Sequence, residues 1–290
     1  MRLARFTADG TDHFGVVEDG AAVALDHRVD AFETLLGDPS SRRTASTDPH
    51  WPVDEVGWLS PIGPAAKVVC VGLNFATHAT EVARDTPAYP TIFPRFPDAF
   101  VGAEQPVVRP FDAQALDWEG EAALVIGTYS RRVPVGTAMA HVAGVTCMAE
   151  NSERDWQSHS GQVTAGKNWH ASGAAGPWIT TPDELSSPLR VTTRLNGEIA
   201  QDDTTDRLTF PFAQLISYIS TFTPLRPGDV IATGTPAGVG VRRIPPRFLR
   251  PGDVLTVEVS GVGVLRNTVV DEAAADPTHR TTSLTSGART

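Results

Sequence analysis

The sequence predicts an α+β protein in which short strands outnumber helices and a small β-rich domain precedes a larger one. Three observations support this fold class. Short runs of strand-forming residues alternate with Asp-Gly turn signals near the N-terminus. Continuous apolar runs within 67–72 and 122–126 are typical of buried strands. Residues 212–219 place Phe, Leu, Ile and Ile at the spacing of a helix that packs on a sheet.

The chain is predicted to divide into three parts. Residues 1–60 form the small N-terminal β-rich domain, and the Pro-Ile-Gly-Pro run at 61–64 marks its boundary. The larger domain spans residues 61–275 and carries all the candidate functional residues. Residues 276–290 are polar, and we expect them to form a disordered tail.

The N-terminal domain contains clear local signals but no group of residues that suggests chemistry. Arg2–Phe6 and His13–Val17 have the pattern of short strands, while Asp9-Gly10 and Asp19-Gly20 are hairpin turn signals. Residues 30–37 have the pattern of a short helix that ends at glycine. We therefore assign this domain a structural role.

Composition excludes several classes of function. The net charge of -10 argues against nucleic acid and anionic membranes as partners. No apolar run approaches the roughly 20 residues of a membrane span, and the N-terminus lacks a signal-peptide pattern, so a cytoplasmic protein is expected. The two cysteines, Cys70 and Cys147, both sit in apolar runs, which favours small core residues over a disulfide or a metal site.

The stretch from Leu116 to Gly127 carries the strongest chemical signal. Glu119 and Glu121 lie two positions apart at the start of an apolar run, so in a strand both side chains point to one face. Two carboxylates aimed at one space repel unless a cation or a shared proton neutralises them, and hard oxygen ligands suit Mg²⁺, Mn²⁺ or Ca²⁺. The alternative is a strand end with its glutamates in water.

Two further positions suggest acid–base chemistry. His78 and Glu81 are three residues apart, so on a helical turn the carboxylate can orient the imidazole as a general base; a surface His–Glu pair is the alternative. Lys67 and Lys167 are the only lysines among 24 basic residues. Lys167 therefore indicates a position that needs a compact ammonium group rather than a guanidinium. The alternative is that a lysine remains there by chance.

Two more features of the larger domain bear on a site. Glu150 ends an apolar strand pattern and is a third candidate carboxylate. The glycine-rich loop at 233–240 follows a strand but lacks the Gly-Lys-Ser/Thr ending of a phosphate-binding loop, and no helix pattern follows it. Its backbone N–H groups are suited to face a carboxylate.

Taken together, these residues resemble the fumarylacetoacetate hydrolase family. The motifs occur in order from about residue 60 to residue 270, and the small N-terminal unit fits as well. They are Gly72–Phe75 with His78 and Glu81, Asp117–Glu121, Ser152 with Arg154, Asp155 and Gln157, Gly166-Lys167, Gly176–Trp178, Asn196–Glu198, Pro227–Val230 and Gly234–Gly240.

The resemblance implies a fold and a metal site. The fold is a mixed, layered β-sheet or β-roll of the type found in the C-terminal domain of that family, usually as a homodimer. The metal is Mg²⁺ or Mn²⁺, bound by Glu119, Glu121 and a third acid. That third ligand is an aspartate in the family, and Glu150 stands there in this sequence. Because glutamate is one methylene longer, Ca²⁺ or Mn²⁺ should tolerate the change better than Mg²⁺.

The resemblance also assigns catalytic and substrate-binding roles. His78 and Glu81 match the water-activating dyad, and Lys167 matches the family's lysine, which would neutralise a developing oxyanion. Two departures occur in the substrate region, where Arg95 replaces a lysine and His170 an aspartate. The predicted substrate-binding residues are Arg95, Arg154, Gln157, His170, Gly234 and Thr235.

The function favoured by these residues is metal-dependent hydrolysis of a C–C bond in an acylpyruvate-like β-diketo acid, a small anionic keto acid. The cation would hold the keto and enolate oxygens while His78 activates water. Decarboxylation of a β-keto acid such as oxaloacetate, enol–keto isomerisation and hydration of a dienoate would use the same enolate chemistry. A catalytically silent ligand-binding protein is the alternative from a different class.

Overall fold

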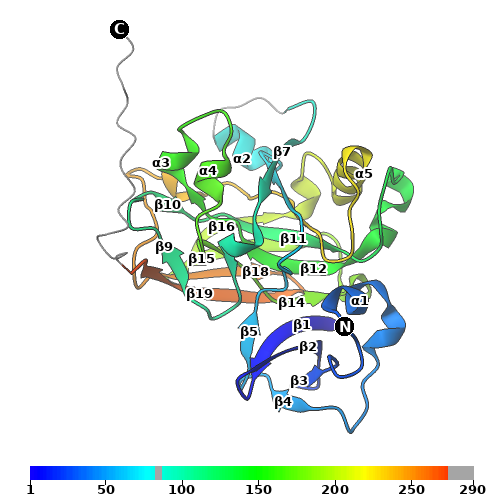
Figure 1. The fold of residues 1–290 in the computed structure, drawn as a ribbon. Coiled ribbons are helices and arrows are strands. Elements are labelled where there is room, and N and C mark those ends of the chain that lie inside the picture. Colours follow the sequence, from blue (N-terminus) through cyan, green and yellow to red (C-terminus); the bar gives the residue numbers. More distant parts are fainter. Residues whose placement is uncertain (82–86, 274–290) are drawn as a thin grey trace.

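The computed structural model describes residues 1–81 and 87–273 (Figure 1). The side chains of residues 78–80 also lie outside the described part. The whole of the predicted tail at 276–290, and the side chain of His78, therefore lie outside the described residues. Strands dominate the described residues, as expected from the sequence.

A twelve-stranded mixed sheet forms the framework. Most neighbours in it are antiparallel, but two pairs, β17 with β6 and β14 with β8, are parallel. In spatial order its main path runs β4 (His50–Pro52), β3 (Ala21–Ala24), β2 (Thr11–Glu18), β1 (Arg2–Ala8), β14 (Gly173–Thr180), β12 (Val142–Ala149), β11 (Gly120–Ile126), β17 (Val230–Ala232), β6 (Val68–Gly72) and β7 (Thr91–Arg95). Off this path, β5 (Gly57–Leu59) pairs with β1, and β8 (Phe100–Val101) pairs with β14.

A second sheet of five strands packs against the first. Its order is β16 (Glu198–Thr204), β15 (Arg190–Leu195), β18 (Val254–Val259), β19 (Gly263–Asp271) and β9 (Val107–Arg109). A short pair, β10 (Leu116–Asp117) with β13 (Ser152–Glu153), lies beside them. The two sheets share one apolar cluster, which confirms the predicted mixed, layered α+β fold.

Helices are few and short. The longest is α5 (Phe212–Phe222), whose buried residues include Leu215, Ile216 and Ile219, as the apolar spacing predicts. The other α-helices are α1 (Phe32–Gly37), α2 (Ala76–Glu81), α3 (Arg154–Gln157) and α4 (Thr164–Lys167). Short 3₁₀ segments occupy Pro39–Arg42, Pro97–Ala99, Val135–His141, Pro182–Glu184, Thr205–Arg207 and Gly240–Arg242. In Figure 1, α2, α3 and α4 gather at the end of the molecule opposite the N-terminal strands.

The N-terminal strands extend the large sheet. The Asp9-Gly10 and Asp19-Gly20 turns have positive φ at both central residues, which suits the tight hairpins that their sequences predict. Strand β1 then pairs with β14 at Leu3 opposite Ile179. The first 60 residues are thereby joined to the strands that carry the candidate site.

The central strand β11 explains how the core is organised. All of its residues are buried, and they alternate between the two faces of the sheet. Leu124 belongs to the cluster shared with the second sheet and α5, whereas Val125 belongs to the cluster shared with α1. Burial on both faces requires the continuous apolar sequence observed after Glu121.

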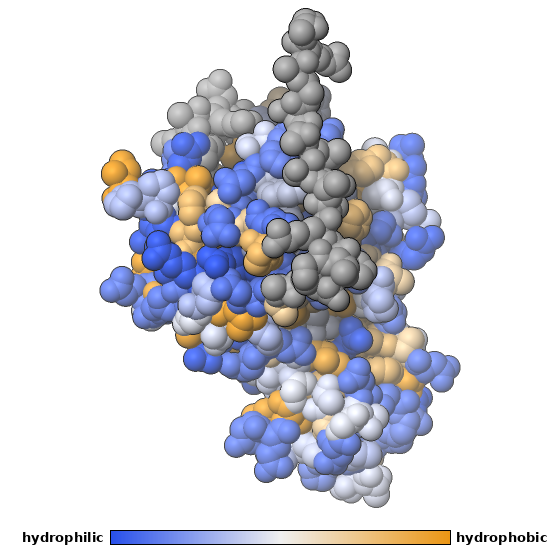
Figure 2. All heavy atoms as spheres, turned by 60° about the vertical axis from the view of Figure 1, so that its left-hand side comes forward, coloured by the Kyte–Doolittle hydropathy of each residue, from blue (hydrophilic) through white to orange (hydrophobic). Residues whose placement is uncertain are grey.

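Hydrophilic residues predominate on the face shown in Figure 2, where apolar residues lie scattered among them. Within residues 1–81 and 87–273, no helix combines the length and apolar character that a membrane span requires.

Close approach of strands makes some glycines in the sheet irreplaceable. A Cβ at Gly144 in β12 would lie 2.3 Å from the backbone oxygen of Thr180, whereas a Cβ at Gly136 would meet nothing within 4 Å. We expect Gly144→Ala to lower the free energy of unfolding by about 1–3 kcal/mol or more through overpacking, and Gly136→Ala to leave it nearly unchanged. Urea unfolding of both variants checks this, and equal midpoints would contradict the close packing of β12 on β14.

Candidate active site

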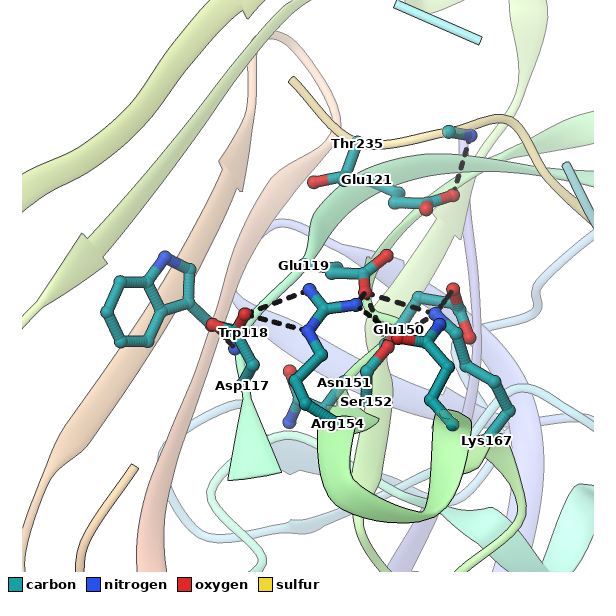
Figure 3. A network of polar contacts seen from close by, with 12 residues as sticks. Asp117, Trp118, Glu119, Glu121, Glu150, Asn151, Ser152, Arg154, Lys167 and Thr235 are labelled. Atoms are coloured by element: carbon teal, nitrogen blue, oxygen red, sulfur yellow. Dashed lines mark hydrogen bonds and ion pairs between the residues drawn. The ribbon is translucent and has the colours of Figure 1, made fainter. Parts of the chain in front are cut away.

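Three buried glutamates form a compact acidic cluster, which we call the acid cluster: Glu119, Glu121 and Glu150 (Figure 3). One ligand oxygen from each lies within 4.8 Å of the others, and the residues are at most 7% exposed. Glu121 lies in β11, and Glu119 stands just before its first residue, Gly120. Gly120 is paired with Ala149, and the Glu150 N–H donates to the backbone oxygen of Glu119 at 2.8 Å. The alternative of glutamates in water therefore does not hold.

Gly120 itself is required by the neighbouring sheet. A Cβ at this position would lie 1.9 Å from Oγ1 of Thr193 in β15, so only glycine allows the second sheet to approach here. The Gly120 N–H donates to Oε1 of Gln201 at 2.9 Å. The strand between the two glutamates is thus fixed by the layer packed against it.

Cations surround two of the three acids. Lys167 Nζ lies 2.5 Å from Glu150 Oε2 and 3.1 Å from Glu119 Oε1. Arg154 Nη1 lies 2.9 Å from Glu119 Oε1, and Arg95 Nη1 lies 2.9 Å from Glu150 Oε1. These ion pairs offset the cost of burying like charges together.

Glu121 is different, because no lysine or arginine of the described residues lies within ion-pair distance of it. Its Oε2 accepts the backbone N–H of Gly234 at 2.8 Å (Figure 3). Burial, with the neighbouring Glu150 and Glu119, raises the pKa of Glu121 well above its usual range. A buried carboxylate beside two others, with no cation of its own, is the arrangement that a divalent metal ion fits.

The cluster also sets the charge state of its lysine. Burial alone would lower the pKa of Lys167, but Glu119 and Glu150 outweigh it, so the pKa is raised and the group stays an ammonium. For Glu150 the effects have the opposite sign: burial raises the pKa of this carboxyl group, and the positive charges of Lys167 and Arg95 lower it. Lys167 is therefore a fixed positive charge rather than a neutral base.

Asp117 and Ser152 support the cluster. Both occur in the family motifs, but the sequence analysis predicted no role for either residue. Asp117 accepts the N–H groups of Gly240 at 2.6 Å and Val241 at 3.0 Å, and Arg154 Nε at 2.9 Å. Ser152 Oγ donates to Glu119 Oε1 at 2.5 Å. The signal for Asp117 is its place two residues before Glu119, which continues the same alternation.

The glycine-rich loop contacts the acids through its backbone, as its sequence suggested. Gly234 has a φ of 107°, and a Cβ there would lie 2.8 Å from Cβ of Asn74, so glycine is needed to aim its N–H at Glu121. Thr235 Oγ1 donates to the backbone oxygen of Gly120 at 2.9 Å. Farther along, the Gly238 N–H donates to Oε1 of Glu81 at 2.9 Å. One loop thus links α2 to the acid cluster.

The remaining predicted residues lie at differing distances from the cluster. Arg95 is buried and bound to Glu150, and Gln157 reaches the cluster through Arg154, whose Nη1 donates to its Oε1 at 2.9 Å. His170 is exposed after α4. The backbone of His78 lies in α2, but its side chain is outside the described residues, so its role stays a prediction.

We expect Glu121 to control the response of the protein to a divalent cation. Glu121→Gln keeps an acceptor for the Gly234 N–H but removes the carboxyl group that would bind the cation. Mn²⁺ at 100 times its Kd should stabilise the wild-type protein by about 2.7 kcal/mol and should not stabilise Glu121→Gln. Thermal unfolding with Mn²⁺ and with EDTA measures this.

A matched control is Glu258→Gln, which changes an exposed glutamate of β18 and should preserve the full response to Mn²⁺. A Glu121→Gln protein stabilised by Mn²⁺ as strongly as the wild type would contradict a metal site at the acid cluster.

Two family models match the chain. One, described as fumarylacetoacetate (FAA) hydrolase C-terminal, covers residues 67–270, and the other, described as Rv2993c-like, N-terminal, covers residues 1–61. The mitochondrial oxaloacetate tautomerase FAHD2A of Bos taurus is 38% identical over 290 residues, spanning 93% of this chain and 92% of that protein.

Two solved structures also match. Fumarylacetoacetate hydrolase from psychrophilic Exiguobacterium antarcticum superimposes with a TM-score of 0.84 and is 33% identical, over 94% of this chain and all of that one. A protein described as 5-carboxymethyl-2-hydroxymuconate delta-isomerase, from Mycobacterium smegmatis, gives a TM-score of 0.78 at 33% identity and the same coverage. The resemblance expected from the sequence motifs is confirmed.

Proposed function

The chain belongs to the fumarylacetoacetate hydrolase family, and we propose that it is a divalent-metal-dependent tautomerase that interconverts the enol and keto forms of a small 2-oxo dicarboxylate of the oxaloacetate class. The observation that carries the proposal is the buried acid cluster, in which no lysine or arginine of the described residues forms an ion pair with Glu121. The match to an oxaloacetate tautomerase over nearly the whole of both chains favours this reaction over the C–C hydrolysis that the sequence first suggests.

Glu119, Glu121 and Glu150 would hold the cation, and Mg²⁺ and Mn²⁺ are the candidates because all three donors are hard oxygens. When bound, the ion supplies electrophilic stabilisation of an enolate oxygen. Arg95, Arg154 and Lys167 keep the acids in place before the ion arrives, so the ligands are preorganised.

The charge of the site fits an anionic substrate. Among the described residues, the four acids Glu119, Glu121, Glu150 and Asp117 and the three cations Arg95, Arg154 and Lys167 sum to one negative charge when all the acids are ionised, the state that a bound cation favours. A divalent cation converts this into one positive charge. A small dicarboxylate is therefore attracted to the loaded site.

Tautomerisation requires a base that moves a proton between carbon and solvent, and Glu81 is the described candidate. The Gly238 N–H holds its carboxylate next to the loop that contacts Glu121. Hydrolysis would require an activated water in addition, the task predicted for His78. C–C hydrolysis stays the second candidate, because a structurally similar protein is described as a fumarylacetoacetate hydrolase.

The test is the decay of enol absorbance of oxaloacetate with purified protein and Mn²⁺, followed by the same assay in EDTA. A tautomerase accelerates enol decay in the presence of Mn²⁺ while total oxaloacetate is conserved. Glu119→Ala should abolish this acceleration and retain the fold, whereas Glu258→Gln should behave as the wild type.

Product analysis separates the rivals. Pyruvate with CO₂ from oxaloacetate would identify a decarboxylase, and pyruvate from an acylpyruvate would identify a hydrolase. Metal binding without turnover of either compound would overturn the proposal and leave a silent ligand-binding protein.

We expect Glu81→Gln to separate proton transfer from binding. Glutamine preserves the acceptor for the Gly238 N–H but cannot take a proton, so kcat should fall about 10²–10⁴-fold while KM changes little. Steady-state kinetics on the oxaloacetate enol measures both constants. An unchanged kcat would remove Glu81 from the proton-transfer step.

A further inference from the structure

We propose that Arg95 is a positioning residue: it sets the carboxylate of Glu150 and thereby the affinity of the acid cluster for its cation. The proposal rests on the metal dependence proposed above and adds a residue whose guanidinium acts through a ligand rather than on the substrate. It departs from the substrate-binding role that the sequence assigned to Arg95.

Arg95 is held on several sides. It is the last residue of β7, and its side chain is fully buried. Nη1 donates to Glu150 Oε1 at 2.9 Å and to the backbone oxygen of Asn151 at 3.0 Å, while Nη2 donates to Ser172 Oγ at 3.4 Å. The guanidinium also lies over the ring of Phe100, 4.4 Å from its centroid. A side chain fixed in this way cannot swing out to bind a substrate.

Two cations hold the carboxylate of Glu150, one at each oxygen. Oε1 accepts from Arg95, and Oε2 accepts from Lys167 at 2.5 Å. Anchoring both oxygens fixes the rotation of the carboxylate about its last bond. A carboxylate oxygen has two lone-pair directions, so an oxygen that accepts a hydrogen bond still has one available for a metal ion.

The surroundings are shaped for a guanidinium rather than an ammonium. The guanidinium contacts its partners through two separate nitrogens, with Nη1 on a carboxylate and a backbone oxygen and Nη2 on a hydroxyl, while its plane lies over an aromatic ring. An ammonium carries all its donors on one atom and would not reach the same positions together. Gly173 leaves room for it, since a Cβ there would lie 3.1 Å from Arg95 Nη2. Arginine at position 95 and the long acid at position 150 therefore form one matched pair.

The contact between Arg95 and Glu150 also depends on where β7 lies in the sheet. This strand ends the main path of the large sheet and pairs with β6. Arg95 joins the end of β7 to the segment that follows β12, where Glu150 lies. The geometry of the ligand thus depends on the docking of an edge strand.

The test is the Mn²⁺ Kd, obtained from the electron paramagnetic resonance signal of free Mn²⁺, for Arg95→Lys in two backgrounds. In the wild-type background, the loss of the fork should raise Kd about 10–100-fold. In the Glu150→Gln background, Arg95→Lys should have no further effect, because Arg95 acts through the ligand that is already gone.

Arg247→Lys is the matched control. It removes the fork from another partly buried pair, with Asp253 at 2.7 Å, in a turn that contributes no acid to the cluster. It should lower the thermal midpoint in EDTA while leaving the Mn²⁺ Kd unchanged. A wild-type Kd for Arg95→Lys, or equal losses in both backgrounds, would overturn the positioning role.

If Arg95→Lys does not fold, Arg95→Met combined with Glu150→Gln removes both buried charges at once, a change that proteins tolerate better. Its Mn²⁺ Kd should equal that of Glu150→Gln alone, and a weaker Kd would contradict the proposal. If the wild-type protein turns over the enol but the Arg95 variant binds Mn²⁺ as tightly as the wild type, only the positioning role is refuted.

If the Arg95 variant binds Mn²⁺ more weakly but the wild-type protein does not turn over the enol, only the tautomerase function is refuted.

Discussion

Three carboxylates buried within 4.8 Å of one another repel, and the structure around them compensates that repulsion in two ways. Arginine and lysine side chains neutralise Glu119 and Glu150, and the backbone N–H of Gly234 approaches Glu121. The compensation is incomplete at Glu121, whose pKa burial and its two acidic neighbours raise. This incomplete compensation is the feature on which the proposed binding of a divalent cation rests.

The fold supplies the rigidity that such a cluster requires. Glu121 lies in β11, buried on both faces, and Glu150 directly follows its neighbour β12. The supporting groups come from β7, α3, α4 and the loop after β17, so contacts from distant parts of the chain converge on the acid cluster. Ligands on central strands are placed more precisely than ligands on mobile loops.

The same geometry explains why related proteins can carry different reaction names. Under the proposed function, the acid cluster would bind the cation, and the cation would stabilise an enolate, which tautomerisation, decarboxylation and C–C hydrolysis all need. In the proposed function, these reactions differ in how protons and water are handled, a task that we assign to the groups near α2, where Glu81 accepts the Gly238 N–H of the glycine-rich loop. The homodimer and the choice between Mg²⁺ and Mn²⁺ stay predictions.

Local rules of sequence determined much of this protein. The two-residue period of a strand predicts Glu119 and Glu121 on one face, Asp-Gly signals specify the N-terminal hairpins, and the ordered motifs identify the family. Tertiary structure alone decided which cation meets which acid. Arg95 and Glu150 are 55 positions apart, so their contact depends on how β7 and β12 pack, which no local pattern encodes. The raised pKa of Glu121 has the same origin, since its burial depends on the whole fold.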